Sequence, residues 1–431
     1  MKVTRFGALV AVAALAFSAC SNTPGASGTA AAGATTPAGT AAANGTKPED
    51  ALGVVTIAPG DPIHIPFWGV LSGADASLGQ DSLYGVQVAM ADKGGKILGH
   101  EITNGTNGDG LCTVEGGAAA AQKLAADSTI VALVGSSCSD ETVGGIKALT
   151  DAGMTTISSS NTRPALTAPD RGPEYAGYLR TAHSDAFQGK AVAEFVYNEL
   201  KKTKAATIHD GSAYAEALQG VFAEEFKKLG GTIVIQEQVE KTTTDMTPVL
   251  TRVAGAKPEV IYFPVFVAAG GFIAAQAHKV SGLESSVLIG SDGMFTADFV
   301  KAAGPAAKDM YLSSPNFSAF QAGYTAFLPK YKALAGKDPI SAFHAHAYDA
   351  FNIIAAAIEK VGVQGSDGTL WIGRKALRDA IFATKDFQGL TGVLSCSATG
   401  DCGAPLIAVY QITQREVDGT WPPQAPVWPK K

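Results

Sequence analysis

The chain has 431 residues, of which 46% are hydrophobic and 17% are charged. This composition is typical of a folded protein, and the length is sufficient for two ordinary domains, each with its own core. The net charge of −6 lacks the basic excess with which nucleic-acid-binding proteins attract phosphates, so we expect no nucleic-acid partner.

Residues 1–19 have the features of a secretory signal peptide. Lys2 and Arg5 precede a short apolar run, Phe6–Phe17, and small residues follow it. The stretch FSAC, residues 17–20, resembles a bacterial lipobox, which implies cleavage before Cys20 and attachment of lipid to its thiol. An ordinary secretory signal with an incidental cysteine is the alternative.

Residues 20–55 begin with the candidate lipidated Cys20 and continue as a tract rich in Ala, Gly, Thr, Pro, Ser and Asn. Such a tract buries too little apolar surface to offset the entropy that ordering would cost. We therefore expect a flexible tether between a lipid anchor and a soluble extracytoplasmic body. A second membrane-spanning candidate does not follow, so the lipid is expected to be the only membrane contact.

From Ile63 onward the sequence alternates short apolar strands with amphipathic helices. The predicted strands are Ile63–Leu71, Ile130–Val134, Ala205–His209, Thr232–Ile235, Val260–Val265, Val287–Ile289 and Met310–Ser313. The predicted helices are Ser82–Asp92, Gly117–Ala126, Ala186–Lys202, Ala213–Leu229, Gly270–Val280, Gly323–Ala335, Phe343–Val361 and Ile372–Phe382. This alternation predicts βαβ units and mostly parallel sheets covered on both faces. A hairpin at Cys396 and a strand near Pro405–Gln411 are expected to be antiparallel additions.

Four cysteines remain when Cys20 is set aside as a lipidation site. An even number in an exported protein predicts two disulfides. Cys396 and Cys402 flank SATGD, a turn-rich stretch suited to a hairpin, which leaves Cys112 to pair with Cys138. A zinc site is the competing interpretation, but the spacing matches no finger or ribbon pattern.

Motifs of enzymes are mostly absent. The sequence has neither a G-x-x-x-x-G-K-[ST] loop nor a G-x-S-x-G nucleophile elbow. His344 and His346 form an H-x-H without accompanying carboxylates, which favours a structural pair over a metal site. His209 and Asp210 follow a strand and are candidates for acid/base chemistry, although Gly211 favours a turn. We predict no catalytic set, no metal and no cofactor.

Several stretches together resemble the Leu/Ile/Val-binding-type solute receptors of bacterial ABC importers. In order along the chain they are GVLSGADASLGQ (69–80), LVGSSCSDET (133–142), ISSSNTRPALT (157–167), LRTAHSDAFQG (179–189), IHDGSAYAEAL (208–218), TDMTPVLTRV (244–253), IGSDG (289–293) and FHAHAYDA (343–350). Each stretch alone is weak evidence for the family. The resemblance is specific because the stretches follow one another in the order found in the family.

The resemblance implies an α/β fold of two doubly wound lobes with mostly parallel sheets, joined by a three-crossing hinge, as in type I periplasmic binding proteins. Lobe 1 is expected to comprise residues 56–183 plus 314–389, and lobe 2 residues 184–313 plus 390–431. A ligand is expected in the cleft between the lobes.

The resemblance also implies a site for a ligand carboxylate. Ser139, with backbone N–H groups at the start of the following helix, is expected to hold the carboxylate together with Ser160 and Thr162. A helix N-terminus carries unpaired donors and a partial positive charge, which favour an anion. In the family pattern, the position of Cys138 pairs with that of Cys112 and pins this loop.

From the other lobe, the resemblance implies that Asp292 pairs with a ligand ammonium, because an unpaired buried charge is costly. Tyr214 is expected to form a wall of the pocket. Leu78, Phe266 and Phe343 are expected to line it. Each residue alone has an ordinary structural alternative: a helix cap, a turn or a core position.

The chain departs from the family pattern at several positions. Asp140 and Glu141 stand where the family more often has hydroxyl residues. At this position next to the expected site, we expect their charges to repel a ligand carboxylate. Asp292 replaces a longer glutamate, and Leu78 replaces an aromatic residue. Since members of the family also bind amides, urea and aromatic acids, these departures leave the ligand open.

The sequence therefore predicts an extracytoplasmic solute-binding lipoprotein that captures a small polar ligand, a branched-chain or other amino acid, by closing two lobes. Its expected partners are the ligand and ABC permease subunits, and it is expected to be a monomer. One alternative is a ligand sensor of the same fold that signals to a membrane receptor. Another is a hydrolase of small amides that uses His209 and Asp210.

Overall fold

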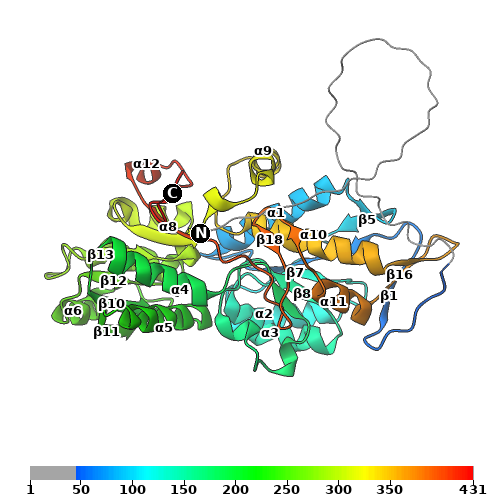
Figure 1. Cartoon of the computed structure of the whole chain (residues 1–431), viewed down its shortest axis with the longest axis horizontal. Coiled ribbons are helices and arrows are strands. Elements are labelled where there is room, and N and C mark those ends of the chain that lie inside the picture. Colours follow the sequence, from blue (N-terminus) through cyan, green and yellow to red (C-terminus); the bar gives the residue numbers. More distant parts are fainter. Residues whose placement is uncertain (1–44, 431) are drawn as a thin grey trace, which may run out of the picture. The chain divides into compact units, whose positions relative to one another are not determined.

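The computed structural model describes residues 45–430. The predicted signal peptide, Cys20 and most of the predicted tether lie outside the described residues. The described chain forms two lobes, each built on its own mainly parallel sheet (Figure 1). Lobe 1 contains the cyan elements around β7 and β8, and lobe 2 contains the green elements around β10 to β13.

The central sheet of lobe 1 has the strand order β6-β3-β7-β8-β9, and all its neighbouring strands are parallel. The strands are β3 (Phe67–Gly69), β6 (Gly108–Asp109), β7 (Leu133–Gly135), β8 (Thr156–Ser158) and β9 (Tyr178–Arg180). Two small sheets extend the lobe: β2 (Ile63–His64), β5 (His100–Thr103) and β4 (Lys96–Ile97); and β1 (Val54–Ile57), β16 (Leu370–Gly373) and β15 (Val363–Gln364).

Helices pack against this sheet in pairs, α2 against α3 and α1 against α10. The helices of lobe 1 are α1 (Ala76–Asp92), α2 (Val114–Ala125), α3 (Ser139–Asp151), α9 (Gly323–Ala335), α10 (His344–Val361) and α11 (Arg374–Phe382). Gly85 of α1 permits the close approach of α10, because a Cβ there would lie 2.0 Å from the carbonyl oxygen of His344. The sheet residues Val134 and Ile157 are fully buried with Ile354 in one apolar core.

The sheet of lobe 2 has the order β11-β10-β12-β13-β14-β19. Its first five strands are parallel: β10 (Lys204–His209), β11 (Thr232–Gln238), β12 (Val260–Tyr262), β13 (Val287–Gly290) and β14 (Tyr311–Pro315). The last strand, β19 (Ile407–Gln411), is antiparallel to β14, as the sequence predicts. The helices of this lobe are α4 (Asp185–Glu194), α5 (Ala213–Lys228), α6 (Thr247–Gly255), α7 (Val267–Ala277), α8 (Ala297–Ala303) and α12 (Gln414–Val417).

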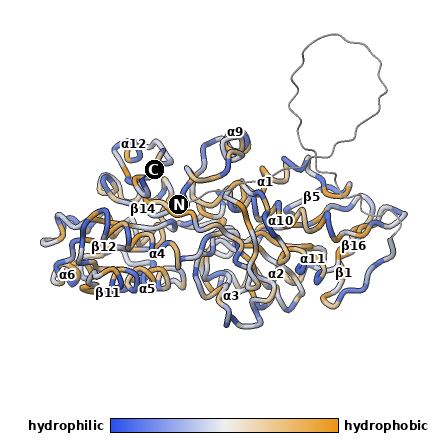
Figure 2. Tube along the Cα trace, in the orientation of Figure 1, coloured by the Kyte–Doolittle hydropathy of each residue, from blue (hydrophilic) through white to orange (hydrophobic). Residues whose placement is uncertain are grey.

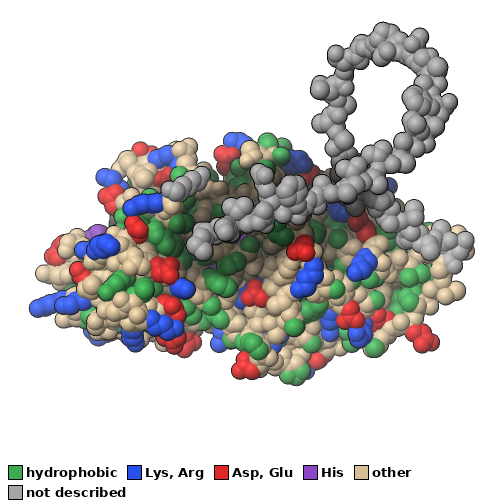
Figure 3. Space-filling model, in the orientation of Figure 1, with side chains coloured by type: hydrophobic (Ala, Val, Ile, Leu, Met, Phe, Trp, Pro, Cys, Tyr) green, Lys and Arg blue, Asp and Glu red, His purple; other side chains and the backbone are tan. Residues whose placement is uncertain are grey.

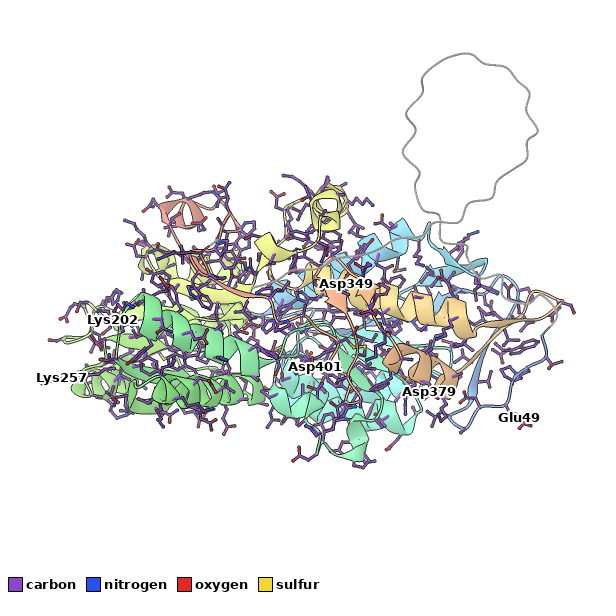
Figure 4. The ribbon with its side chains drawn as sticks, in the orientation of Figure 1. Glu49, Lys202, Lys257, Asp349, Asp379 and Asp401 are labelled. Carbon is purple, nitrogen blue, oxygen red and sulfur yellow. A yellow bond between two sulfur atoms is a disulfide. The ribbon has the colours of Figure 1, made fainter. Side chains whose placement is uncertain are left out.

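The chain passes between the lobes three times: after β9, after β14 and before β19. Hydrogen bonds tie two of these segments to lobe 1, since the Cys402 N–H donates to the Arg180 carbonyl at 3.0 Å and the Thr181 hydroxyl donates to the His346 carbonyl at 2.8 Å. The buried Arg180 guanidinium pairs at 3.0 Å with Asp401, which is labelled in Figure 4. The hinge is therefore held by a charge pair as well as by backbone contacts.

The two disulfides join the expected partners. Cys112–Cys138 closes a span of 26 residues, and Cys396–Cys402 closes a span of six. The second bridge follows a short hairpin, β17 (Phe387–Gln388) and β18 (Val393–Leu394).

Several predicted boundaries differ from the structure. The strand expected over 63–71 is two strands, β2 and β3, because Pro66 lies between them and lacks an N–H. The helix expected from Gly270 begins at Val267, and Ile372 belongs to β16 instead of α11. The helix expected over 186–202 is α-helical only to Glu194 and ends in a π-helical turn, Phe195–Glu199.

The lobe boundaries also shift. Val54 and Val55, expected in the tether, pair with β16, and the carboxylate of Asp50 accepts N–H groups from α11. Lobe 1 therefore begins before residue 56. Cys396 and Cys402, expected in lobe 2, are buried in the core of lobe 1 because their segment follows the β17–β18 hairpin.

Hydrophilic stretches of the trace lie at the periphery of both lobes in Figure 2. On the face drawn in Figure 3, Lys and Arg side chains are interspersed with Asp and Glu side chains. Within residues 45–430, no helix combines the length and apolar character that a membrane crossing requires.

Candidate ligand-binding site

Loops at the carboxyl ends of the parallel strands meet between the lobes. They enclose a narrow cavity of about 10 Å³. Its lining is Leu78, Ser137, Cys138, Ser139, Ser160, Tyr214, Phe266, Asp292, Gly293 and Phe343. Seven of the eight predicted ligand-binding residues are in this set. A cavity of about 520 Å³ lies elsewhere, beside α10 and β17, and none of the predicted residues lines it.

The wall from lobe 1 is rich in hydroxyl groups. Ser137 and Ser139 follow β7, and Ser160 follows β8, so all three lie at one edge of the sheet. The Ser160 hydroxyl donates to the Ser137 carbonyl at 2.8 Å. The Ser137 hydroxyl is buried and has no hydrogen-bond partner among the described residues. Ser137 was not predicted as a site residue, although it lies in the stretch LVGSSCSDET (133–142).

Glu141 uses backbone N–H groups next to the start of α3, where a ligand carboxylate was expected to bind. Its buried carboxyl accepts the N–H groups of Ser137, Cys138 and Cys112 at 2.9–3.0 Å. Two backbone donors that immediately precede α3 are thus already bonded within the protein. Burial raises the pKa of Glu141 to about 7, and the three donors oppose that shift. Its carboxyl is directed at backbone donors, so the expected repulsion of a ligand by Glu141 is not supported.

Asp140 makes contacts across the cleft. Its carboxylate accepts the Ala213 N–H at 2.8 Å and pairs with the Lys241 ammonium at 2.9 Å, both from lobe 2. The Lys241 ammonium also donates to the Cys112 carbonyl at 3.1 Å. Asp140 is therefore neutralised by an interlobe ion pair, which also answers the concern that it repels a ligand.

Two more hydrogen bonds join the lobes at the rim of the cleft. The Asp75 carboxylate accepts the Val267 N–H at 3.1 Å, and the Ser77 hydroxyl donates to Asp298. Burial raises the pKa of Asp75 to about 6. Together with the Asp140–Lys241 pair, these contacts connect the lobes without using the residues predicted to touch the ligand.

Asp292 supplies the acidic wall from lobe 2. Its Oδ1 atom accepts the Gln188 amide at 2.7 Å and the Tyr214 hydroxyl at 2.6 Å. Burial raises the pKa of Tyr214 well above its usual range, and the Asp292 charge adds to the shift, so the phenol keeps its proton and donates. Gly293 permits this crowding, because a Cβ there would lie 3.2 Å from the Tyr214 ring.

Asp210 positions the aromatic wall and is not paired with His209. Its carboxylate accepts the Phe266 N–H at 3.0 Å and both the N–H and the hydroxyl of Ser212. The His209 ring instead accepts the Gly211 N–H at 3.3 Å. The acid/base pair of the hydrolase hypothesis is not formed, and the turn interpretation accounts for both residues.

The predicted H-x-H pair is buried and structural. His344 contacts the Asp81 carboxylate at 2.9 Å and the Tyr324 hydroxyl at 2.8 Å, so both of its ring nitrogens are engaged. Burial lowers the pKa of His346 well below its usual range, which keeps that ring neutral.

Thr162 does not line the cavity. It is fully buried, its carbonyl accepts the Asp185 N–H at 2.8 Å, and its hydroxyl lies beside the Asp185 carboxyl. Asp185 and Gln188, both in the first turn of α4, were not predicted from the sequence: the Asp185 N–H donates to Thr162, and the Gln188 amide donates to Asp292. The signal for them was the polar turn RTAHSDAFQG at the first crossing, where the chain enters lobe 2.

Two α/β lobes, with the carboxyl ends of both sheets facing one small polar cavity, define a bilobal ligand-binding protein. The family model for periplasmic binding proteins matches residues 62–415, and the chain belongs to this family. The fold is that of type I periplasmic binding proteins, as solved structures of similar proteins also indicate.

Curated relatives share about a quarter of their residues with this chain. The Leu/Ile/Val-binding protein homolog 3 of Brucella melitensis is 28% identical over 353 residues, which cover 81% of this chain and 91% of that protein. A leucine-, isoleucine-, valine-, threonine- and alanine-binding protein of Pseudomonas aeruginosa is 26% identical and covers 81% and 90%.

Solved structures agree with this fold. A branched-chain amino acid transporter substrate binding protein of Streptococcus pneumoniae, in complex with isoleucine, has a TM-score of 0.71 at 27% identity and covers 82% of this chain and 96% of its own. A solute binding protein from R. palustris, in complex with benzoate, has a TM-score of 0.70 at 19% identity, covers 82% and 93%, and shows the fold alone.

Proposed function

We propose that this protein captures a small zwitterionic ligand, an α-amino acid of the branched-chain type, and delivers it to an ABC permease. The observation that carries the proposal is the polarity of the cavity. Lobe 1 presents hydroxyl donors, Ser137 and Ser139, whereas lobe 2 presents the carboxylate of Asp292. A molecule with one negative and one positive end matches the polarity of these walls, and the lobes must move apart to admit it, because the cavity of about 10 Å³ is smaller than an amino acid.

In this proposal, Ser139 holds the ligand carboxylate with the unpartnered hydroxyl of Ser137, and Ser160, whose hydroxyl proton is donated to the Ser137 carbonyl, lies beside them. Asp292 pairs with the ammonium, since its Oδ1 atom is oriented by Gln188 and Tyr214. The apolar side chain lies among Leu78, Phe266 and Phe343. Thr162 keeps only an indirect role, through Asp185.

Function follows from closure and not from catalysis. A ligand that contacts both lobes stabilises the arrangement in which they meet more than any arrangement in which they are apart. The rim contacts Asp140–Lys241 and Asp75–Val267 favour the same arrangement. Asp210, which accepts the Phe266 N–H, and His209, which accepts the Gly211 N–H, do not form the acid/base pair that the hydrolase alternative needs.

The location of the protein is part of the proposal. We expect Cys20 to carry lipid and to hold a monomeric protein at the outer face of a membrane, next to its permease. Cys20→Ser is expected to release the protein into the soluble fraction while signal cleavage continues. Unchanged membrane association of the variant contradicts the anchor.

Titration calorimetry with matched ligands tests the function. L-Leucine, L-isoleucine and L-valine are expected to bind. 4-Methylpentanoate lacks the ammonium of leucine and isoamylamine lacks its carboxylate, and each is expected to bind at least about thirtyfold more weakly, because one wall loses its charge partner. Binding of benzoate or 4-methylpentanoate without binding of any amino acid contradicts the proposal.

A further inference from the structure

Helix α10 begins at a residue that cannot cap it. The N-cap is Phe343, whose side chain makes no capping hydrogen bond. The start of a helix leaves backbone N–H groups without acceptors in the helix, and a Ser, Thr, Asp or Asn side chain usually accepts one of them. Phenylalanine has no acceptor, and the buried Phe343 lines the ligand cavity instead. A buried helix end of this kind needs an acceptor from elsewhere in the fold.

The acceptor is Asp81, which lies on α1. Its Oδ2 atom accepts the N–H of Phe343 at 3.1 Å and the N–H of His344 at 2.9 Å. Its Oδ1 atom accepts the Ile340 N–H at 3.0 Å and the Tyr331 hydroxyl at 2.8 Å. The carboxylate is fully buried and holds the whole turn that precedes α10. The partial positive charge of a helix N-terminus also favours a negative group at this place.

The surroundings keep Asp81 ionised. Burial raises its pKa, but the His344 ring and the other hydrogen-bond donors outweigh burial, so the pKa lies below its usual range. Since a carboxylate only accepts, His344 Nδ1 donates to it at 2.9 Å, while Nε2 of the same ring contacts the Tyr324 hydroxyl at 2.8 Å. The rings of Phe317 and Phe327 stack on the His344 ring, at interplanar angles of 15° and 12°. Asp81 therefore binds a turn whose side chains are themselves fixed.

The helix that carries Asp81 also carries another part of the apolar wall. Leu78 lies one turn before Asp81 on α1, and both side chains are buried on the same face of the helix. Leu78 and Phe343 both line the cavity. Gly85, one turn after Asp81, lets α1 approach α10 closely, because a Cβ there would lie 2.0 Å from the carbonyl oxygen of His344. The positions of Leu78 and Phe343 are therefore both set by α1.

Two further rings contact the ring of Phe343. His183 stacks on it with a centroid distance of 6.0 Å, and His346 meets it edge-on at 5.3 Å. Burial lowers the pKa of both histidines, so these rings are neutral. They determine the tilt of the Phe343 ring, whereas Asp81 determines where its backbone lies. A shift of that backbone consequently moves the ring within the cavity wall.

We propose that Asp81 is a positioning residue for ligand selection: it caps α10 in place of Phe343 and thereby fixes the spacing between Leu78 and Phe343 that accommodates a branched aliphatic side chain. This inference rests on the proposed function, because it assigns the apolar part of the ligand to these two residues. Asp81 does not line the cavity, so it acts through the two residues that do. A ligand with a very small side chain, such as L-alanine, is expected to be little affected by their spacing.

The affinities for two ligands of different size test this role. Asp81→Asn keeps the size of the side chain but places an NH₂ group among N–H donors, so the turn before α10 loses acceptors and Phe343 shifts. In calorimetric titration of the full chain, we expect binding of L-isoleucine to weaken about tenfold, the lower end of what a misfitted apolar group costs, and binding of L-alanine to weaken less than about twofold. The ratio of the two affinities is therefore expected to fall roughly five- to tenfold.

Asp349→Asn is the matched control, because it changes a similar acid on the same helix. Asp349, which is labelled in Figure 4, is fully buried and accepts the N–H groups of Leu390 and Thr391, away from the ligand cavity. We expect this variant to lower the unfolding midpoint, as Asp81→Asn does, and to leave the ratio of affinities within about twofold of the wild type. An unchanged ratio in Asp81→Asn overturns the inference, and so does an equal change in both variants.

A second variant keeps the test decisive if Asp81→Asn does not fold. His344→Phe keeps a ring between Phe317 and Phe327 and removes only the Nδ1 donor, so that Oδ2 of Asp81 retains its two backbone N–H groups. The ratio of affinities is expected to fall in the same direction by roughly two- to threefold, since one of several hydrogen bonds is lost. In the absence of folded Asp81→Asn, an unchanged ratio in His344→Phe overturns the inference.

A measurement without ligand separates this inference from the proposed function. When 4-fluorophenylalanine replaces phenylalanine, the fluorine resonance of Phe343 is identified by its absence from the spectrum of Phe343→Leu. We expect this resonance to move in Asp81→Asn and to stay in Asp349→Asn, because Asp81 and Phe343 both belong to lobe 1 and their contact does not depend on closure. A resonance that stays in Asp81→Asn overturns the inference whether or not amino acids bind. Failure of every amino acid to bind the wild type contradicts the proposed function alone.

Discussion

Two pairs of acidic residues lie next to the cleft, and they differ in how their charges are satisfied. Asp140 and Glu141, at the start of α3, have partners for their carboxyl groups: backbone N–H groups, and the ammonium of Lys241. Asp185 and Asp292, on the side of lobe 2, are both buried, and neither carboxyl oxygen of Asp185 has a hydrogen-bond partner within the described chain. From the sequence, Asp140 and Glu141 were expected to repel a ligand carboxylate, whereas Asp292 was expected to pair with a ligand ammonium.

The comparison shows that the role of an acidic residue near a binding site depends on its hydrogen-bond and charge partners and not on its position. A carboxylate that accepts three backbone N–H groups stabilises the fold. A carboxyl group that lacks partners inside a folded protein has capacity left for a ligand or for a proton. We therefore assign the first pair to structure and Asp292 to ligand capture.

Removal of Glu141 gives the largest expected effect on stability. Glu141→Ala leaves the buried N–H groups of Ser137, Cys138 and Cys112 without an acceptor. We expect the free energy of unfolding to fall by ~3–5 kcal/mol, since each unsatisfied buried donor costs about 1–3 kcal/mol and entering water recovers part of it. Urea denaturation at pH 7 measures the change. A loss below about 1 kcal/mol contradicts the structural assignment of the first pair.

Neutralising Asp292 has the largest expected effect on affinity. Asp292→Asn keeps the size of the side chain but removes the charge that faces the ligand ammonium. We expect affinity for L-isoleucine to fall by ~2–5 kcal/mol, or roughly thirtyfold to several-thousandfold. Asp140→Asn is the matched control from the other pair, with an expected loss of no more than about fivefold. Equal losses in both variants contradict the contrast between the pairs.

The fold was largely accessible from the sequence because its long helices and buried strands have strong periodic patterns. The elements that were missed are short. β8 and β9 have three residues each, and β1 and β16 pair only because distant segments meet. Strands of this length carry little pattern of their own, and their pairing depends on tertiary contacts.

The candidate site was accessible for a different reason. Ser139, Ser160 and Asp292 follow strands at the carboxyl edge of parallel sheets, where side chains of separate segments meet. The hydrogen-bond and charge partners of the acidic residues could not be predicted from the sequence. The ammonium that neutralises Asp140 comes from Lys241, which is 101 residues away, and the lack of partners around Asp185 is visible only in three dimensions.

Ser139 allows a test of the hydroxyl groups that are proposed to bind the ligand carboxylate. Ser139 lines the cavity. Within the described chain, its hydroxyl takes part in one hydrogen bond, which it accepts from the Arg163 N–H at the long distance of 3.4 Å. Ser139→Ala is expected to weaken L-isoleucine binding by about 1 kcal/mol, or roughly fivefold. Ser160→Ala is expected to cost less, because the Ser160 hydroxyl proton is already donated to Ser137. The reverse order in calorimetry contradicts this assignment of donors.

The smallest effect is expected at the interlobe ion pair. Lys241 lies in lobe 2, touches Asp140 and the Cys112 carbonyl of lobe 1, and has no place in the cavity lining. Lys241→Met keeps most of the apolar stem and removes the charge. Since a partly exposed ion pair contributes about 0.5–1 kcal/mol, affinity is expected to fall only two- to fivefold.

Salt distinguishes this effect from a loss of ligand contact. Screening weakens a partly exposed pair, so wild-type affinity is expected to decline as NaCl rises from about 0.05 to 0.5 M, while the affinity of Lys241→Met changes less. If affinity falls as far as in Asp292→Asn, or if the variant keeps the full salt dependence, Asp140 and Lys241 do more than join the lobes, and the acids of the first pair belong to the site after all.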